Sequence, residues 1–288
     1  MAWHRGVVIK TAHDLEAMRS AGRVNAQALA AAVAAVRPGV TTADVNAAAV
    51  EVLRKHGAGM AFLGYPGPYP YPAATCISVN DELVHGIPGP RRLQAGDIVS
   101  IDCGSVVDGF VGDSAITVGV GEIAEEAQRL LEVTCAALFA GIERMRAGNR
   151  TGDVGAAIQS VVERAGFNVV REYTGHGVGR AMHEDPQVPN YGKAGTGQPL
   201  KPGMTVALEP MVLAGGPETR ILRDQWTVAS RDGRRTAHFE HTVAVTADGP
   251  RILTTLEQDL DGLPAAAYND YFVGRSSAAV REVEAKRT

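Results

Sequence analysis

Hydrophobic positions recur every three or four residues in four segments of the chain. This periodicity predicts helices over residues 12–36, 42–57, 122–146 and 151–166. Thr42 and Thr151 are expected to cap the second and fourth helices, and Gly57 and Gly166 to end them. The apolar run "AQALAAAVAAV" is too short to cross a bilayer and is stopped by Pro38, so it belongs to the first helix.

Two pairs of segments resemble each other at nearly the same spacing. "RPGVTTADVNAAAVEVLRKHGA" resembles "RAGNRTGDVGAAIQSVVERAGF", and "LQAGDIVSID" resembles "LKPGMTVALE". The second pair places Asp102 on Glu209. The chain therefore consists of two related halves, roughly 12–118 and 122–250, each a helix pair followed by strands. We expect them to pack face to face as one pseudo-symmetric α+β domain, in which each half delivers an acid to a central site.

The stretch "IDCGSVVDGFVGD", residues 101–113, alternates as two strands around the turn dipeptide Asp108-Gly109. With that loop, Asp102 lies diagonal to Asp113 on one face, and a register shifted by one residue on each strand would place them directly opposite. In either register two carboxylates converge, so one must hold a proton or a cation must lie between them. The alternative is an exposed hairpin face with solvated aspartates.

Three more residues of the same kind lie in or beside apolar runs: His176 in "YTGHGVG", Glu209 in "ALEPMV" and Glu240 in "HFEHTVAV". Each has an ordinary alternative, as a loop histidine, an edge residue or an exposed strand position. An unpaired charge in such surroundings is costly. Four acids and one imidazole of this kind together therefore favour a functional constellation.

The composition narrows the class of protein. The 288 residues are 45% hydrophobic and 21% charged, as in an ordinary globular protein of one large or two small domains. A net charge of -4 gives no electrostatic case for nucleic acid or an anionic membrane as the main partner. Three cysteines without close spacing fit a reducing cytosol, and "MAWHRGVVIK" lacks the apolar core of a signal peptide, so we expect a cytoplasmic protein.

Six strings occur in an order that resembles the methionine aminopeptidases of the bacterial type I class, over roughly residues 8–255. They are "CISVNDELVHGIP", "GDIVSIDCG", "DGFVGD", "GHGVGRAMHEDPQVPNY", "LKPGMTVALEPM" and "HFEHTVAVT". The resemblance implies the pita-bread (creatinase/aminopeptidase) fold and metal-dependent removal of the initiator methionine from nascent proteins, with a preference for a small second residue. It also implies a single catalytic domain over 1–288, a monomer, and transient contact with ribosomes.

The resemblance further implies the roles of the five constellation residues. Asp102 would chelate one metal ion, Asp113 and Glu240 would bridge two, and His176 and Glu209 would complete the other. Glu209 would also be the proton shuttle, although the sequence alone does not distinguish it from Glu240 in this role. A hydroxide that bridges the metals would attack the peptide carbonyl. An oxygen-rich site with one imidazole suits two divalent ions such as Co, Mn or Fe(II).

Other positions match the substrate site of the family. His85 and His183 would contact the substrate near the scissile peptide, although either could be a packed or surface histidine. The apolar methionine pocket would be lined by Tyr65, Cys76 and Trp226. Phe62 and Met182 depart from the family pattern, and in the proline-rich loop "YPGPYPYPAAT" either Tyr69 or Tyr71 would stand at the rim.

Two other classes share features with the sequence. Aminopeptidase P and prolidase enzymes have the same five ligands, but they usually carry a large additional N-terminal domain. A pita-bread binding protein without catalysis would be expected to lose ligands or gain a basic surface. The tail from about 256 to 288 lies outside the resemblance and receives no function.

Overall fold

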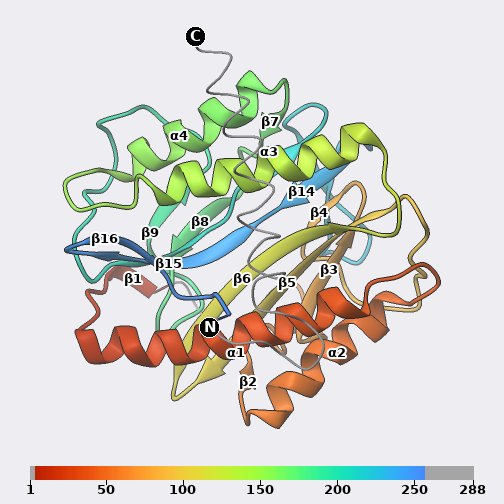
Figure 1. Cartoon of the computed structure of the whole chain (residues 1–288), viewed down its shortest axis with the longest axis horizontal. Coiled ribbons are helices and arrows are strands. Elements are labelled where there is room, and N and C mark those ends of the chain that lie inside the picture. The colour runs from red at the N-terminus through yellow and green to blue at the C-terminus, as the bar shows by residue number, and fades with distance from the viewer. Residues whose placement is uncertain (1–3, 257–288) are drawn as a thin grey trace.

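Four helices form two packed pairs in the computed structural model, which describes residues 4–256 (Figure 1). They are α1 (Ala12–Ala35), α2 (Thr42–Lys55), α3 (Glu125–Ile142) and α4 (Thr151–Arg164). Each begins or ends within a few residues of the position that the hydrophobic periodicity predicts. Gly57 and Gly166 follow α2 and α4 with φ of 63° and 83°, the left-handed conformation that favours glycine at a helix end.

The predicted helix caps are wrong by one residue. The N-cap of α2 is Thr41, whose hydroxyl accepts a hydrogen bond from the backbone N–H of Asp44. The Asp44 carboxylate accepts from Thr41 N in return, and this reciprocal box needs a spacing of three residues, which Thr42 does not have. In α4 the equivalent cap position is Arg150, with Asp153 as its acidic partner, and Thr151 is the first helical residue.

Sixteen strands are found in the described part of the chain. They are β1 (His4–Val7), β2 (Gly59–Met60), β3 (Thr75–Val79), β4 (Glu82–Val84), β5 (Ile98–Val107), β6 (Phe110–Gly119), β7 (Asn168–Val169), β8 (Thr174–Gly177), β9 (Glu184–Pro189), β10 (Thr205–Leu208), β11 (Met211–Leu213), β12 (Thr219–Ile221), β13 (Val228–Ser230), β14 (Thr236–His238), β15 (Glu240–Thr246) and β16 (Gly249–Ile252).

Strands from both predicted halves join in one ten-stranded sheet. Its order is β1-β9-β8-β10-β15-β6-β5-β2, with β16 added beside β15 and β3 beside β5. The two halves meet where β15 pairs with β6, at Glu240 opposite Ala115. Two sheets of three strands, β14-β11-β7 and β12-β13-β4, complete the fold.

The helix pairs and the acids lie on opposite sides of the large sheet. Helix α1 packs on β5 and β6, and α4 packs on β9 (Figure 1). On β6, the Ser114 hydroxyl donates to Asn25 Oδ1 of α1, so the side chain of Asp113 points away from that helix. The core beneath the helices is apolar, and Leu29, Ile116 and Leu138 are fully buried in it.

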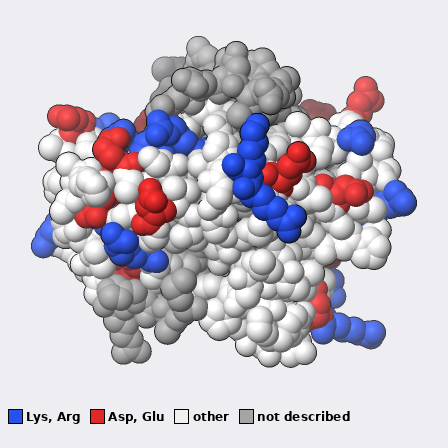
Figure 2. Space-filling model, turned by 90° about the horizontal axis from the view of Figure 1, so that it is seen from below, with Lys and Arg blue, Asp and Glu red and all other residues white. Residues whose placement is uncertain are grey.

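The described surface carries both signs of charge. Figure 2 shows basic and acidic side chains interspersed on the face that it presents. Among residues 4–256, no helix combines the length and the apolar character that a membrane span requires. The tail that the sequence analysis places at about 256–288 lies outside the described residues from residue 257 onward.

Candidate metal centre and substrate pocket

Neighbouring strands bring the predicted acids onto one face of the sheet. In the β5–β6 hairpin Val107 pairs with Phe110, and Asp102 lies opposite Ala115. Of the two registers considered from the sequence, the structure therefore has the diagonal one. The row from Asp102 through Ala115 continues to Glu240 on β15, and Glu209 follows β10 one residue past the pair of Leu208 and His241.

A second row of residues lies beside the first. Each of its members is two residues away from a member of the first row on the same strand, and therefore lies on the same face. In this second row Asp113 of β6 is next to Thr242 of β15. Thr242 lies opposite Ala207 of β10, and Ala207 pairs with His176 of β8. Ala115 and Ala207 have small side chains, so neither fills the space between the acids. The five predicted constellation residues therefore face one volume, although they come from five separate segments.

The distances between these groups are those of a site for a cation. Ligand atoms of Asp113, His176 and Glu240 all lie within 4.8 Å of one another, and all three side chains are buried. His176 Nε2 is 3.4 Å from Glu209 Oε1 and 3.9 Å from Asp113 Oδ2. Asp102 lies beside Asp113 in the same cavity.

Burial has a strong effect on the protonation of these groups. It raises the pKa of Asp113 to about 8. The pKa values of Asp102, Glu209 and Glu240 rise well above their ordinary range, first through burial and then through the neighbouring Asp113 carboxylate. The same burial lowers the pKa of His176 to about 4, so its ring is neutral at physiological pH. A bound divalent cation would reverse this penalty by stabilising the ionised acids.

The donor set fits a divalent metal ion. Asp102 Oδ1, Asp113 Oδ1 and Glu240 Oε1 are buried and have no hydrogen-bond partner within residues 4–256. Buried carboxylate oxygens without a partner are costly unless a cation coordinates them. His176 Nδ1–H donates to the carbonyl of Gly177 over 3.0 Å, which leaves the lone pair of Nε2 facing the acids.

One cavity of about 140 Å³ contains every site residue that the sequence predicts. It is lined by Phe62, Tyr65, Tyr71, Cys76, His85, Asp102, Asp113, His176, Met182, His183, Glu209, Trp226 and Glu240. Cys76 is buried, and burial raises the pKa of its thiol well above the ordinary value, as suits an apolar wall.

The two predicted substrate histidines, His85 and His183, both line this cavity. The ring of His183 is 4.2 Å from the ring of His176, and its Nδ1 is 2.6 Å from the hydroxyl of Tyr65. His85 has a φ of 61°, which is rare for a residue with a side chain. Its neighbour Gly86 holds that conformation, because Gly86 N donates to Ser78 Oγ and Gly86 O accepts from Ile77 N.

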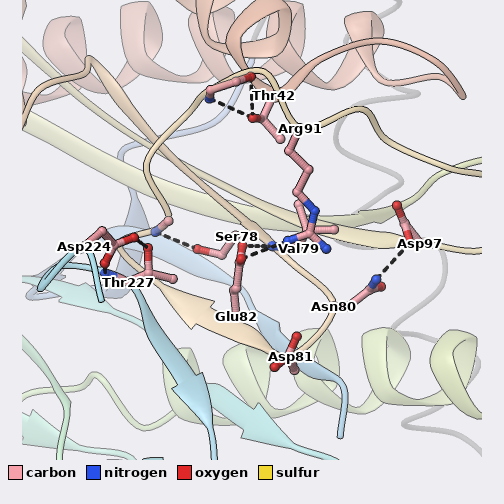
Figure 3. Close-up of polar contacts among 12 residues, drawn as sticks. Thr42, Ser78, Val79, Asn80, Asp81, Glu82, Arg91, Asp97, Asp224 and Thr227 are labelled. Atoms are coloured by element: carbon pink, nitrogen blue, oxygen red, sulfur yellow. Dashed lines mark hydrogen bonds and ion pairs between the residues drawn. The ribbon is translucent and has the colours of Figure 1, made fainter. Parts of the chain in front are cut away.

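Hydrogen bonds in the same region fix the aromatic wall. The Asp224 carboxylate accepts from the backbone N–H and the hydroxyl of Thr227 (Figure 3). It also accepts from the backbone N–H of Trp226. Tyr71 is buried, and its ring meets that of Trp226 edge-on at 5.1 Å. Tyr69 instead lies at the surface, 37% exposed, and donates to Asp224 O. Of the two tyrosines considered from the sequence, Tyr71 is the one in the cavity.

Sequence reasoning did not assign a role to His238, which lies beside two of the acids. Its Nε2 is 3.7 Å from Glu240 Oε2 and 3.8 Å from Glu209 Oε2. The string "HFEHTVAV" contains the signal that could have found it, since residues two apart on a strand share a face. The missing information was that this alternation continues from β15 back into β14.

Known proteins are similar to this chain in sequence. The sequence profile described as Metallopeptidase family M24 matches residues 16–247. The chain is similar to the methionine aminopeptidase of Clostridium perfringens, with 45% identity over 251 residues that cover 87% of this chain and all of that protein. It is 48% identical over 257 residues to a methionine aminopeptidase 1 of Mycobacterium tuberculosis, covering 87% and 96% of the two chains.

A solved structure agrees with these relatives. The crystal structure of a methionine aminopeptidase from Thermotoga maritima superposes with a TM-score of 0.84 and 46% sequence identity. The match covers 86% of this chain and 99% of that chain. The likeness therefore extends over most of this chain and nearly all of that one.

Proposed function

The chain belongs to metallopeptidase family M24 and, within it, to the methionine aminopeptidases, and from this premise we propose which residues carry the reaction. The expected pita-bread fold and the expected hydrolase class are confirmed by these relatives. The protein is a metal-dependent enzyme that removes the N-terminal methionine from polypeptides. We propose that it acts on nascent chains in the cytoplasm as a monomer in transient contact with ribosomes, and that it prefers a small second residue.

One observation carries the assignment of the metal centre. Four carboxylates and one imidazole converge on a single buried volume, and three of the acids have an oxygen atom without a hydrogen-bond partner in the described chain. We propose that Asp102, Asp113, His176, Glu209 and Glu240 hold two divalent ions of the Mn, Fe(II) or Co type. Such ions supply Lewis acidity toward the scissile carbonyl and toward water.

The protein groups around this centre would move the protons. Glu209 is 12% exposed in its side chain, so it lies at the boundary between the buried acids and the open cavity. We propose that it takes a proton from the attacking water and passes it to the leaving amine. His183 Nε2–H would donate to the carbonyl oxygen as negative charge develops there, and His85 would contact the substrate near the scissile peptide.

The apolar part of the cavity would bind the methionine side chain. Tyr65, Cys76 and Trp226 are the predicted lining, and Phe62 and Met182 lie in the same wall. A thioether is apolar and polarisable, and it makes favourable contacts with aromatic rings. A neutral, buried thiol at Cys76 suits this pocket because it adds no charge.

The experiment that tests this function compares two tripeptides. Protein loaded with Mn²⁺ or Co²⁺ is expected to release methionine from Met-Ala-Ser and to leave Ala-Pro-Ala intact, and chelation of the metal should abolish the release. Cleavage of Ala-Pro-Ala with no release from Met-Ala-Ser would overturn the proposal in favour of a proline-directed activity. Binding of either peptide without turnover would instead favour a pita-bread protein that has lost catalysis.

A further inference from the structure

A second imidazole lies within 4 Å of two of the proposed metal ligands. His238 is the last residue of β14 and is 2% exposed. Its Nε2 is 3.7 Å from Glu240 Oε2 and 3.8 Å from Glu209 Oε2. It is not among the residues that line the cavity.

The backbone of His238 is anchored, which fixes where its ring can reach. Its N–H donates to Thr117 Oγ1 over 2.8 Å, and the Thr117 hydroxyl donates to His238 O over 2.9 Å. Thr117 lies on β6, two residues beyond Ala115 and therefore on the same face as Asp113. On the other side, His238 pairs with Met211 of β11, directly after the Glu209-Pro210 segment.

Neither ring nitrogen of His238 has a hydrogen-bond partner among residues 4–256. A neutral imidazole carries one N–H donor, and a buried donor without an acceptor is costly. The two acidic oxygens that Nε2 faces are the acceptors at hand, and each is less than 1 Å beyond ordinary hydrogen-bond length. Glu209 is thereby placed between two imidazoles, because its other oxygen, Oε1, faces His176 Nε2 at 3.4 Å.

We propose that His238 is a positioning residue of the metal centre, whose Nε2–H is shared between the carboxylates of Glu209 and Glu240 and holds both in the orientation for metal binding. This inference rests on the proposed function, since it takes these two glutamates as ligands. A donor to the oxygen that does not coordinate metal fixes the rotation of a carboxylate and reduces the freedom that metal binding must remove. A partner of this kind typically contributes about 10–100-fold to metal affinity.

The test uses two variants at this position and a matched control. His238→Phe keeps a planar ring without a donor, and His238→Gln keeps an N–H donor on a side chain of similar reach. The control is His241→Phe on β15, which removes another fully buried imidazole from the same segment. His241 points to the opposite face, where its Nδ1 is 2.8 Å from Thr254 Oγ1.

Mn²⁺ affinity and stoichiometry are measured by calorimetry, with melting temperature recorded for every variant. His238→Phe is expected to weaken Mn²⁺ binding about 10–100-fold with unchanged stoichiometry. His238→Gln should lie closer to the parent than to His238→Phe, and His241→Phe should match the parent. Unchanged affinity in folded His238→Phe would overturn the positioning role, and loss of one metal equivalent would make His238 a ligand instead.

A measurement on the parent protein tests the same inference if a variant fails to fold. In protein labelled with ¹⁵N-histidine and loaded with diamagnetic Zn²⁺, His238 is expected to be neutral with its proton on Nε2. A proton on Nδ1 alone, or direct metal coordination through Nε2, would overturn the inference. Absence of any metal binding by the parent would instead contradict the proposed function, so the two failures are distinguishable.

Discussion

The hydroxyl of Tyr65 lies 2.6 Å from Nδ1 of His183, which joins the proline-rich loop to the segment between β8 and β9. If His183 donates from Nε2 to a substrate carbonyl, its neutral ring has an acceptor lone pair on Nδ1, and the Tyr65 hydroxyl is a donor within reach that favours this tautomer. Burial lowers the pKa of His183 to about 3, so the ring is a neutral donor rather than an imidazolium.

His183→Ala is expected to keep both metal ions and to lose rate. A donor aimed at developing charge acts mainly in the transition state, so kcat should fall about 10²–10³-fold while KM changes less. Metal content, melting temperature and kcat are measured together on the same preparation. Full metal with unchanged kcat would show that the histidine only packs, and lost metal would show that it supports the metal centre.

Tyr65→Phe is expected to have a smaller effect of the same kind. The phenyl ring keeps the wall of the methionine pocket, and only the bond to His183 Nδ1 is lost. One neutral hydrogen bond contributes about 0.5–1.5 kcal/mol, which corresponds to a fall in kcat of about 2–10-fold at unchanged KM. In a His183→Ala background the same change should have no further effect on kcat, and an additive loss would contradict the coupling.

Asp113→Ala is expected to disrupt metal binding more than Asp102→Ala. Asp113 lies within 4.8 Å of ligand atoms from both His176 and Glu240, whereas Asp102 stands at one end of the row. A ligand shared by two ions leaves both under-coordinated when it is removed. Calorimetric titration with Mn²⁺ gives the stoichiometry of each variant, and near-parental stoichiometry in both would rule out the bridging assignment.

Much of this site can be predicted from the sequence, because the patterns that indicate it lie within short segments of the chain. Strand alternation and the Asp108-Gly109 turn predict that Asp102 and Asp113 converge on one face, and the structure selects the diagonal register of the two considered. The internal repeat places Glu209 in the equivalent strand. The predicted cap of α2, Thr42, is one residue away from the observed cap, Thr41, because either of the two adjacent threonines could begin the helix. Only the three-residue spacing to Asp44 identifies Thr41 as the cap.

Contacts between distant segments could not be predicted in this way. Which tyrosine of "YPGPYPYPAAT" enters the cavity depends on the path of a proline-rich loop, and no periodicity describes such a path. The approach of His238 to Glu209 depends on how β14 pairs with β11, a contact made by strands of three residues each. Short strands carry too little alternation to specify their partners.

Lys10→Met is expected to destabilise the protein and to slow catalysis. Lys10 Nζ lies 2.5 Å from Glu184 Oε2, both side chains are 3% exposed, and Glu184 Oε1 accepts from Ala181 N. Removing one partner of a buried pair costs about 3–5 kcal/mol, because the other charge is left uncompensated. The turn that carries His183 should loosen as well, so kcat should fall in the folded fraction.

The control for this variant is Arg251→Met. Arg251 pairs with Glu16 over 2.6 Å, but these side chains are 45% and 65% exposed. Loss of an exposed pair changes the free energy of unfolding by at most about 1 kcal/mol. Urea unfolding of both variants compares the two pairs, and equal stabilities would mean that burial adds nothing to the importance of the Lys10 pair.

Gly67→Ala is expected to weaken methionine binding without touching the metal centre. A Cβ atom at Gly67 would lie 2.3 Å from the Trp226 ring, so the ring would have to move. Trp226 is held in place by its N–H bond to Asp224 and by the donation of its Nε1–H to Tyr69 O, so its shift would alter the pocket wall. Because the pocket binds the substrate before and during the reaction, KM for Met-Ala-Ser should rise about tenfold, equivalent to about 1.4 kcal/mol, with kcat nearly unchanged.

The control for this variant is Pro68→Ala, at the exposed neighbouring position, which should leave KM at the parental value. A fall in kcat at constant KM in Gly67→Ala would mean that Trp226 acts on the transition state rather than on binding of the methionine side chain.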